Sequence, residues 1–212
     1  MTTSDLPKFS DLDRFETDKI RTSPVIVNIG NLGMQYTMTK NIFRNHGHTG
    51  NGLIMIPESE KAAYSDIFPE FYTYNHDPFN TEILSNFCKT LSQSKDNIFL
   101  QEVSADHDWN KNRDLRYMFI NSRALKTSVM LNMYYPFGMS PVLRSNIDYT
   151  FIFQEQDMSN RRILYDNYAG MFPSFENFCT VMDSVENRCC LVIDNTSHST
   201  SLMEQVFWYD PK

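Results

Sequence analysis

A short segment near the start of the chain has the spacing of a phosphate-binding loop but lacks most of its chemical groups. Such a loop follows the pattern G-x-x-x-x-G-K-[ST], in which backbone N–H groups and a helix N-terminus hold the phosphates, the lysine neutralises their charge and the hydroxyl residue binds Mg²⁺. Gly33 keeps the second glycine, and Gly30 lies within the loop. The first glycine, the lysine and the hydroxyl residue are replaced by Asn28, Met34 and Gln35. On these residues alone, a degenerate phosphate-binding loop and a plain strand-to-helix turn both remain open.

A second segment, NIFLQE at residues 97–102, has the form of a Walker B strand. In that motif a buried apolar strand ends in an aspartate that holds Mg²⁺, and a following acidic residue polarises the attacking water. The aspartate position is occupied by Gln101, a neutral amide and a poor Mg²⁺ ligand, whereas Glu102 keeps the acidic position. Glu102 is therefore either a catalytic base or an ordinary solvated residue at the end of a strand.

The elements that must position these residues alternate along the chain. Apolar runs predict strands and amphipathic spacing predicts helices, while residues 58–78 have little regular pattern and are expected to be mostly irregular. The predicted strands are residues 25–29, 53–56, 97–102, 128–134, 149–153, 189–193 and 204–209, and the predicted helices are residues 36–46, 80–93, 106–125, 141–146, 159–168 and 174–183. This alternation predicts an α/β fold with a parallel-rich central sheet and helices on both faces.

Length and composition favour one domain. The 212 residues carry a formal net charge of −7 with 41% hydrophobic residues, which suits a single buried core over residues 23–212. Residues 1–22 are polar and aperiodic, so we expect a poorly packed N-terminal arm or lead-in. The acidic balance gives no general attraction to nucleic acid, so any DNA contact needs a local patch or a partner.

The expected cellular compartment is inferred from targeting signals that the sequence does not show. No window approaches the ~18 apolar residues of a membrane span, and the first residues lack a basic-then-apolar signal peptide pattern. The four cysteines Cys88, Cys179, Cys189 and Cys190 show no C-x-x-C spacing, which favours reduced, mostly buried thiols over a zinc site or a disulfide. These features predict a protein of the cell interior.

The second half of the chain carries a specific resemblance. The runs YPFGMSPVLRSNIDYTFIFQE (135–155), NYAGMFPSFENFCTVM (167–182), LVIDNT (191–196) and QVFWY (205–209) resemble the packaging ATPases of large nucleocytoplasmic DNA viruses, which are FtsK/HerA-type P-loop ATPases. The resemblance implies a P-loop NTPase-like fold and, in the intact family, ATP and Mg²⁺ used to move genomes into capsids. Within that frame, residues 25–35 match the P-loop, 97–102 the Walker B strand and 118–123 the segment before the sensor strand.

The departures from the family lie at the positions that carry its chemistry. The glutamine that senses the γ-phosphate in the family is matched by Tyr134, in addition to the P-loop and Walker B replacements. Glu102, Arg123 and Arg144 match catalytic positions, as Gly33 matches the loop. Arg144 is either an ordinary surface arginine or a residue that enters a neighbouring subunit's site, as arginines do in ring ATPases.

Three functions remain in competition. The leading hypothesis is a non-hydrolysing structural or regulatory paralogue in genome packaging or virion assembly, with no cofactor of its own. Its partners would be an active packaging ATPase or further copies in a ring, with viral DNA reached through a partner, in the infected host cytoplasm or the virion. The second is an active packaging ATPase with an unorthodox site in which Lys40 replaces the P-loop lysine. The third is a DNA-binding module that keeps the fold without the motor.

Overall fold

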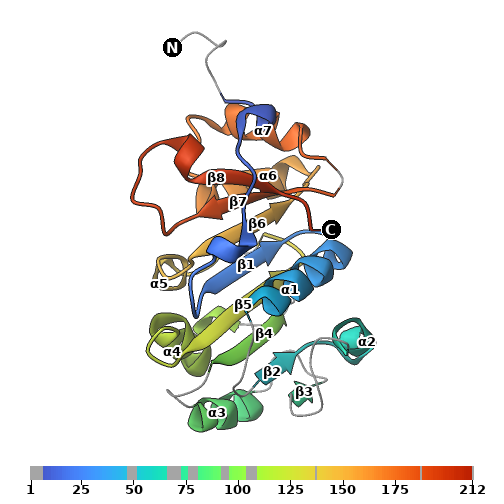
Figure 1. Ribbon diagram of the computed structural model, residues 1–212, viewed down its shortest axis with the longest axis vertical. Helices are drawn as coiled ribbons and strands as arrows, with labels where there is room; N and C mark the ends of the chain where they lie inside the picture. The colour runs from blue at the N-terminus through green and yellow to red at the C-terminus, as the bar shows by residue number, and fades with distance from the viewer. Residues whose placement is uncertain are drawn as a thin grey trace.

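An eight-stranded sheet forms the centre of the computed structural model, in the order β3-β2-β4-β5-β1-β6-β7-β8 (Figure 1). The structure describes residues 7–46, 52–65, 73–75, 81–91, 96–103, 109–136, 138–186 and 188–211. The strands from β3 to β6 are parallel, and β7 and β8 are each antiparallel to their neighbour. The strands are β1 Val25–Ile29, β2 Gly52–Met55, β3 Thr73–Asn75, β4 Asn97–Val103, β5 Thr127–Met133, β6 Tyr149–Phe153, β7 Cys190–Asp194 and β8 Val206–Tyr209. The predicted α/β class with a parallel-rich sheet is confirmed.

Helices cover both faces of this sheet, unequally. One face packs against α3 Thr81–Thr90, α4 Arg113–Asn121, α5 Pro141–Arg144, α6 Met158–Tyr168 and α7 Phe175–Asp183. The other packs against α1 Leu32–His46 and α2 Lys61–Tyr64. Short 3-10 turns are η2 Phe9–Asp11, η3 Thr17–Lys19, η4 Glu58–Glu60, η5 Trp109–Lys111 and η6 Leu202–Glu204. Among the described helices, none is both long and apolar enough to cross a membrane.

The N-terminal segment, residues 7–22, wraps around the β8 edge of the sheet (Figure 1). Leu12 packs into the core on the α7 face, whereas Phe15 and Ile20 pack into the core on the α1 face. The Phe15 N–H donates to the Trp208 carbonyl at 2.8 Å. The expectation that this segment is poorly packed is wrong from residue 7 onward, because large apolar side chains lie at intervals among its polar residues.

Several element boundaries differ from the sequence prediction for local reasons. Helix α1 begins at Leu32 rather than at residue 36, because the Asn31 side chain accepts a hydrogen bond from the Met34 N–H at 3.3 Å and caps the helix. Helix α4 begins later than predicted, because the Asn112 side chain accepts from two N–H groups of its first turn. The stretch expected to be irregular contains α2 and β3, and its residues 66–72 and 76–78 lie outside the described ranges. The predicted N-cap Ser174 of α7 is confirmed.

Candidate functional site

The predicted phosphate-binding loop is a tight turn. Only Gly30 and Asn31 separate β1 from α1. Gly30 has φ +121°, and a Cβ there would lie 2.9 Å from Phe153 Cβ, so glycine is required at this position. Gly33 is instead an ordinary helical residue, whose Cβ would meet only Asn31 Oδ1 at 3.5 Å. A turn this short leaves little backbone to wrap around a phosphate.

The Gln35 side chain closes this turn from inside. It is fully buried, and its Nε2 donates to the carbonyl oxygens of Gly30 and Met133, both at 2.9 Å. The Gly30 N–H also donates to the Met133 carbonyl at 2.9 Å. Met34, at the position expected of a lysine, packs its partly buried side chain against the core on the α1 face. The turn is therefore fastened to the end of β5 by neutral groups.

A buried row of polar side chains lies next to Gln35, across the carboxyl ends of three parallel strands. Asn28, Asn132 and Glu102 are in register on β1, β5 and β4 and lie on the face covered by α1 and α2. Asn28 Nδ2 donates to Asn132 Oδ1 at 2.7 Å, and Asn132 Nδ2 donates to the Tyr64 hydroxyl at 2.9 Å. The Nδ2 groups of both asparagines therefore find acceptors within the protein.

Glu102 is the titratable member of this row and is 7% exposed. Burial raises its pKa to about 7, and the negative charge of Glu60 acts in the same direction. Hydrogen bonding from the hydroxyls of Tyr36 and Tyr64 lowers its pKa, but by less. Tyr36 also donates to Glu60 Oε2 at 2.6 Å. Glu102 is thus a candidate proton donor or acceptor near neutral pH.

The residues of this region do not fit Mg²⁺-bound ATP. Asn28 Oδ1, Gln35 Oε1 and Glu102 Oε1 are buried and lack a hydrogen-bond partner within the described part of the chain. Phosphate oxygens are acceptors too, so the two amide oxygens, and Glu102 in its ionised form, would repel a phosphate placed here. Met34 and Gln35 supply neither the charge nor the hydroxyl ligand of a working loop.

Two further predicted site residues lie at the carboxyl end of β5 and beyond it. Tyr134 directly follows β5, is 52% exposed and packs against Tyr135 with 5.3 Å between ring centroids. Arg144, at the end of α5, donates from Nη1 to Asn167 Oδ1 on α6 at 2.6 Å. Gln101 pairs with Leu131 and Met55 in the sheet, and its side chain lies outside what the structure describes. β5 therefore contributes its Met133 carbonyl, not the Tyr134 side chain, to the turn.

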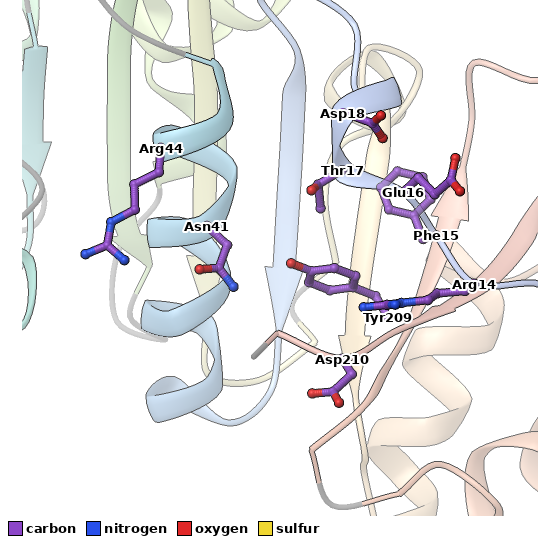
Figure 2. A pocket seen from close by; sticks show the side chains of 9 residues that line it. All are labelled: Arg14, Phe15, Glu16, Thr17, Asp18, Asn41, Arg44, Tyr209 and Asp210. Atoms are coloured by element: carbon purple, nitrogen blue, oxygen red, sulfur yellow. The ribbon is translucent and has the colours of Figure 1, made fainter.

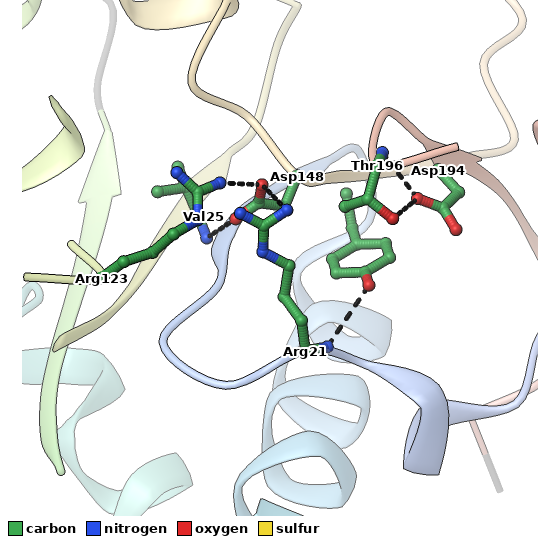
Figure 3. Close-up of polar contacts among 7 residues, drawn as sticks. Arg21, Val25, Arg123, Asp148, Asp194 and Thr196 are labelled. Atoms are coloured by element: carbon green, nitrogen blue, oxygen red, sulfur yellow. Dashed lines mark hydrogen bonds and ion pairs between the residues drawn. The ribbon is translucent and has the colours of Figure 1, made fainter. Parts of the chain in front are cut away.

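Arg123 is at the opposite end of the sheet from the turn, before the start of β5 (Figure 3). Its Nη2 lies 2.6 Å from Asp148 Oδ1, and Arg21 Nη1 lies 3.2 Å from the same oxygen. The second carboxylate oxygen of Asp148 accepts from the Val25 N–H at 2.9 Å. Burial raises the pKa of Asp148 above its usual value, against the effects of the Val25 N–H and Arg123. The structure does not bring Arg123 to the turn of its own chain.

A separate cavity of about 520 Å³ lies between the N-terminal segment, α1 and the end of β8 (Figure 2). The hydroxyl end of Tyr209 on β8 points toward Asn41 of α1. Its described lining combines cations with carboxylates and includes none of the predicted site residues: Arg14, Phe15, Glu16, Thr17, Asp18, Asn41, Arg44, Tyr209 and Asp210. This mixed charge does not select one class of ligand.

Sequence reasoning missed the residues that hold both ends of the sheet together. Asn132 was a visible signal, because an amide inside the apolar strand at residues 127–133 needs a buried partner, as does Asn28 in β1. Asp148, directly before an apolar strand, was a second signal. The role of Gln35 had no local signal, because its partners come from the distant Met133 as well as from Gly30.

The chain is similar in sequence to proteins of large DNA viruses. It is 26% identical to an uncharacterized protein of Acanthamoeba polyphaga mimivirus, over 94% of this chain and 76% of that protein. It is 29% identical to an uncharacterized protein of Invertebrate iridescent virus 6, over 72% of this chain, and spans only 60% of that relative. No family model matches the chain.

The chain has the fold of viral genome-packaging NTPases. The genome packaging NTPase of Sulfolobus turreted icosahedral virus 2, solved with AMPPCP, matches with a TM-score of 0.65 and 12% identity over 90% of this chain and 98% of that one. The pCW3 conjugation coupling protein TcpA, solved with ATPγS, matches with a TM-score of 0.57 and 10% identity over 89% of this chain and 60% of that one. The resemblance read from the sequence is confirmed at the level of the fold.

Proposed function

We propose that the chain is a viral packaging-ATPase-like protein that has lost hydrolysis and acts as a structural or regulatory component in genome packaging or virion assembly. The observation that carries the proposal is the Gln35 side chain, whose amide group ties the turn at Gly30 to the end of β5. In an intact site the hydroxyl residue at this position would hold Mg²⁺. Here the position serves to close the fold.

The viral relatives and the packaging-NTPase fold support the packaging part of this proposal. They also support the proposal that it acts in the infected host cytoplasm or in the virion. The buried acceptor oxygens at Asn28, Gln35 and Glu102 support the loss of nucleotide chemistry. An active enzyme that uses Lys40 is the weaker reading, because Lys40 lies six positions beyond Met34 in the helix, roughly 9 Å along the axis of α1.

The test is thermal denaturation with and without Mg²⁺-bound ATP at millimolar concentration. We expect no shift in Tm, whereas a ligand at a hundred times its Kd would add about 2.7 kcal/mol of stability. A micromolar Kd by calorimetry, about −8 kcal/mol, would contradict the proposal. The combined variant Met34→Lys, Gln35→Thr and Gln101→Asp restores the missing charge and ligands, and we expect it to gain measurable nucleotide binding.

We further propose that the chain acts on an intact packaging ATPase through Arg144. This side chain is half-buried, and Asn167 holds its guanidinium in a fixed direction. A fixed guanidinium at a subunit boundary can stabilise transition-state charge in a neighbour's site. Mixing the two proteins should change the ATPase rate of the active one, and Arg144→Ala should abolish that change while association persists. Co-purification without any effect on the rate would leave only a scaffolding role.

A further inference from the structure

A second cavity, of about 640 Å³, opens at the amino ends of β1, β4 and β5, the end of the sheet opposite the turn. Its described lining is Arg21, Thr22, Ser23, Asp96, Arg123 and Lys126. Three cationic side chains and two hydroxyls therefore face one carboxylate. This local positive charge stands against a chain whose formal net charge is −7.

The buried carboxylate of Asp148 holds the two arginines of this cavity in place. Arg21 and Arg123 share one oxygen of Asp148, whose side chain is 5% exposed, whereas their own side chains are 34% and 46% exposed. One carboxylate neutralises only one of two guanidiniums. Each guanidinium has five N–H donors in a planar fork, and the Asp148 contacts use few of them. The pair thus presents oriented donors to the cavity, and Lys126 leaves a net positive charge there, because Asp148 and Asp96 offset only two of the three cations.

Backbone strain supplies an independent observation at the same place. In the described ranges, the non-glycine residues with positive φ are Ser23, at 51°, and Lys126, at 48°, and both line this cavity. Ser23 precedes a proline, and Lys126 occupies the left-handed position after α4 where glycine or asparagine is usual. The fold alone would favour smaller residues at these positions. Residues whose backbone is held in such sparsely populated conformations cluster at functional sites.

We propose that this cavity binds a phosphate group, with Arg21, Arg123 and Lys126 as its cationic contacts. Guanidinium forks match phosphate oxygens in a bidentate manner, and a lysine adds a point charge. The phosphate could belong to the backbone of DNA or to a free phosphate compound. An ion-pair cluster that only pinned the N-terminal segment would need Arg21 and Arg123 but not Lys126. The inference does not depend on the nucleotide chemistry of the turn at Gly30.

Lys126→Asn gives the sharpest test, because asparagine removes the charge and suits the left-handed backbone. We expect its Tm to match or exceed that of the unchanged protein, while its affinity for the phosphate falls about tenfold, the effect of losing one charged contact. The probes are inorganic pyrophosphate, measured by calorimetry, and a short fluorescent DNA duplex, measured by anisotropy between about 50 and 200 mM salt. With DNA, the slope of log affinity against log salt should become shallower by about one.

Lys89→Gln removes the same charge from the last turn of α3, from a residue that is not in the described lining of the cavity, and should leave both probes unaffected. Arg123→Gln is the second binding variant and should weaken binding in the same direction as Lys126→Asn. Tighter binding of the duplex identifies nucleic acid as the source of the phosphate, and tighter binding of pyrophosphate identifies a small phosphate compound. The proposal is overturned if neither probe binds, or if both cavity variants bind like Lys89→Gln.

Discussion

The two ends of the parallel sheet carry different kinds of polar side chain. At the carboxyl end, where ligands usually bind in α/β sheets, neutral amides are buried: Asn28 donates to Asn132, and Gln35 donates to two backbone carbonyls. At the amino end, Arg21 and Arg123 gather around Asp148 beside an open cavity. The comparison teaches that a fold gives a default place for chemistry, while the side chains decide whether it is used.

The two ends also differ in how readily their polar groups can bind a ligand. Buried amides whose N–H groups bond within the fold offer few donors to a phosphate, but they stabilise a closed turn. Partly exposed guanidiniums keep donors facing solvent, so a ligand can replace water there at low cost. The following substitutions test whether the carboxyl end is structural and the amino end is poised for binding.

The largest expected effect separates the two glycines of the turn. Gly30→Ala should destabilise the protein by about 4 kcal/mol, because it combines φ +121° with a contact at 2.9 Å to Phe153. Gly33→Ala should be neutral or gain up to about 1 kcal/mol, because it lies in regular helix with space for a Cβ. Urea denaturation measures both. A large loss at Gly33 would show that the turn adopts a wider, phosphate-ready conformation instead.

At the amino end, Asp148→Ala should cost about 3 kcal/mol. The change leaves the Val25 N–H without its acceptor and two guanidiniums without their shared carboxylate. The matched control is Asp166→Ala, which breaks the exposed pair with Arg162 on α6 and should cost less than about 1 kcal/mol. Equal losses in chemical denaturation would mean that the Asp148 cluster is ordinary surface.

Glu102 gives the smallest of the three effects and one that depends on pH. Its pKa is raised from 4.5 to about 7, so the folded state retains a proton that the unfolded state releases. The resulting stability is present below pH about 4.5 and is lost as the pH rises through about 7. Glu102→Gln should therefore be about 2 kcal/mol more stable than the unchanged protein at pH 8, with little difference at pH 5.

The control for this pH dependence is Glu176→Gln, on the exposed first turn of α7, which should follow the unchanged protein at both pH values. Denaturation midpoints at each pH give the comparison. If Glu102→Gln lost stability at pH 8, the ionised Glu102 carboxylate would be well solvated in the folded state, and the carboxyl end would be open.

Much of the fold was predictable because it depends on local pattern. The apolar runs of β1, β4 and β6 place those strands within a residue or so of their observed bounds. Helix α1 was placed too late, because Asn31 caps it at a position that the glycines on either side made resemble a loop. Capping by a single side chain is a short-range feature, yet the glycine spacing concealed it.

The candidate sites were less predictable, since they depend on register between distant strands. Asn28 and Asn132 meet only because β1 and β5 are adjacent and aligned. Arg21, Arg123 and Asp148 come from three separated parts of the chain, and no local spacing relates them. The resemblance to packaging ATPases placed Arg123 among catalytic residues. Arg123 precedes β5 and the turn follows β1, and because these two strands are parallel, Arg123 and the turn lie at opposite ends of the sheet.

The contact between the N-terminal segment and β8 has a consequence for synthesis. The Trp208 backbone exchanges hydrogen bonds with Asp13 and Phe15, so during synthesis the N-terminal segment waits for β8. At about 5–20 residues per second that wait lasts on the order of ten to forty seconds. In the last part of it, after β6 is made, the aromatic ring of Phe151 lacks its final cover, since Tyr209 of β8 contacts it. We expect a chaperone that binds nascent chains to bind this exposed aromatic surface.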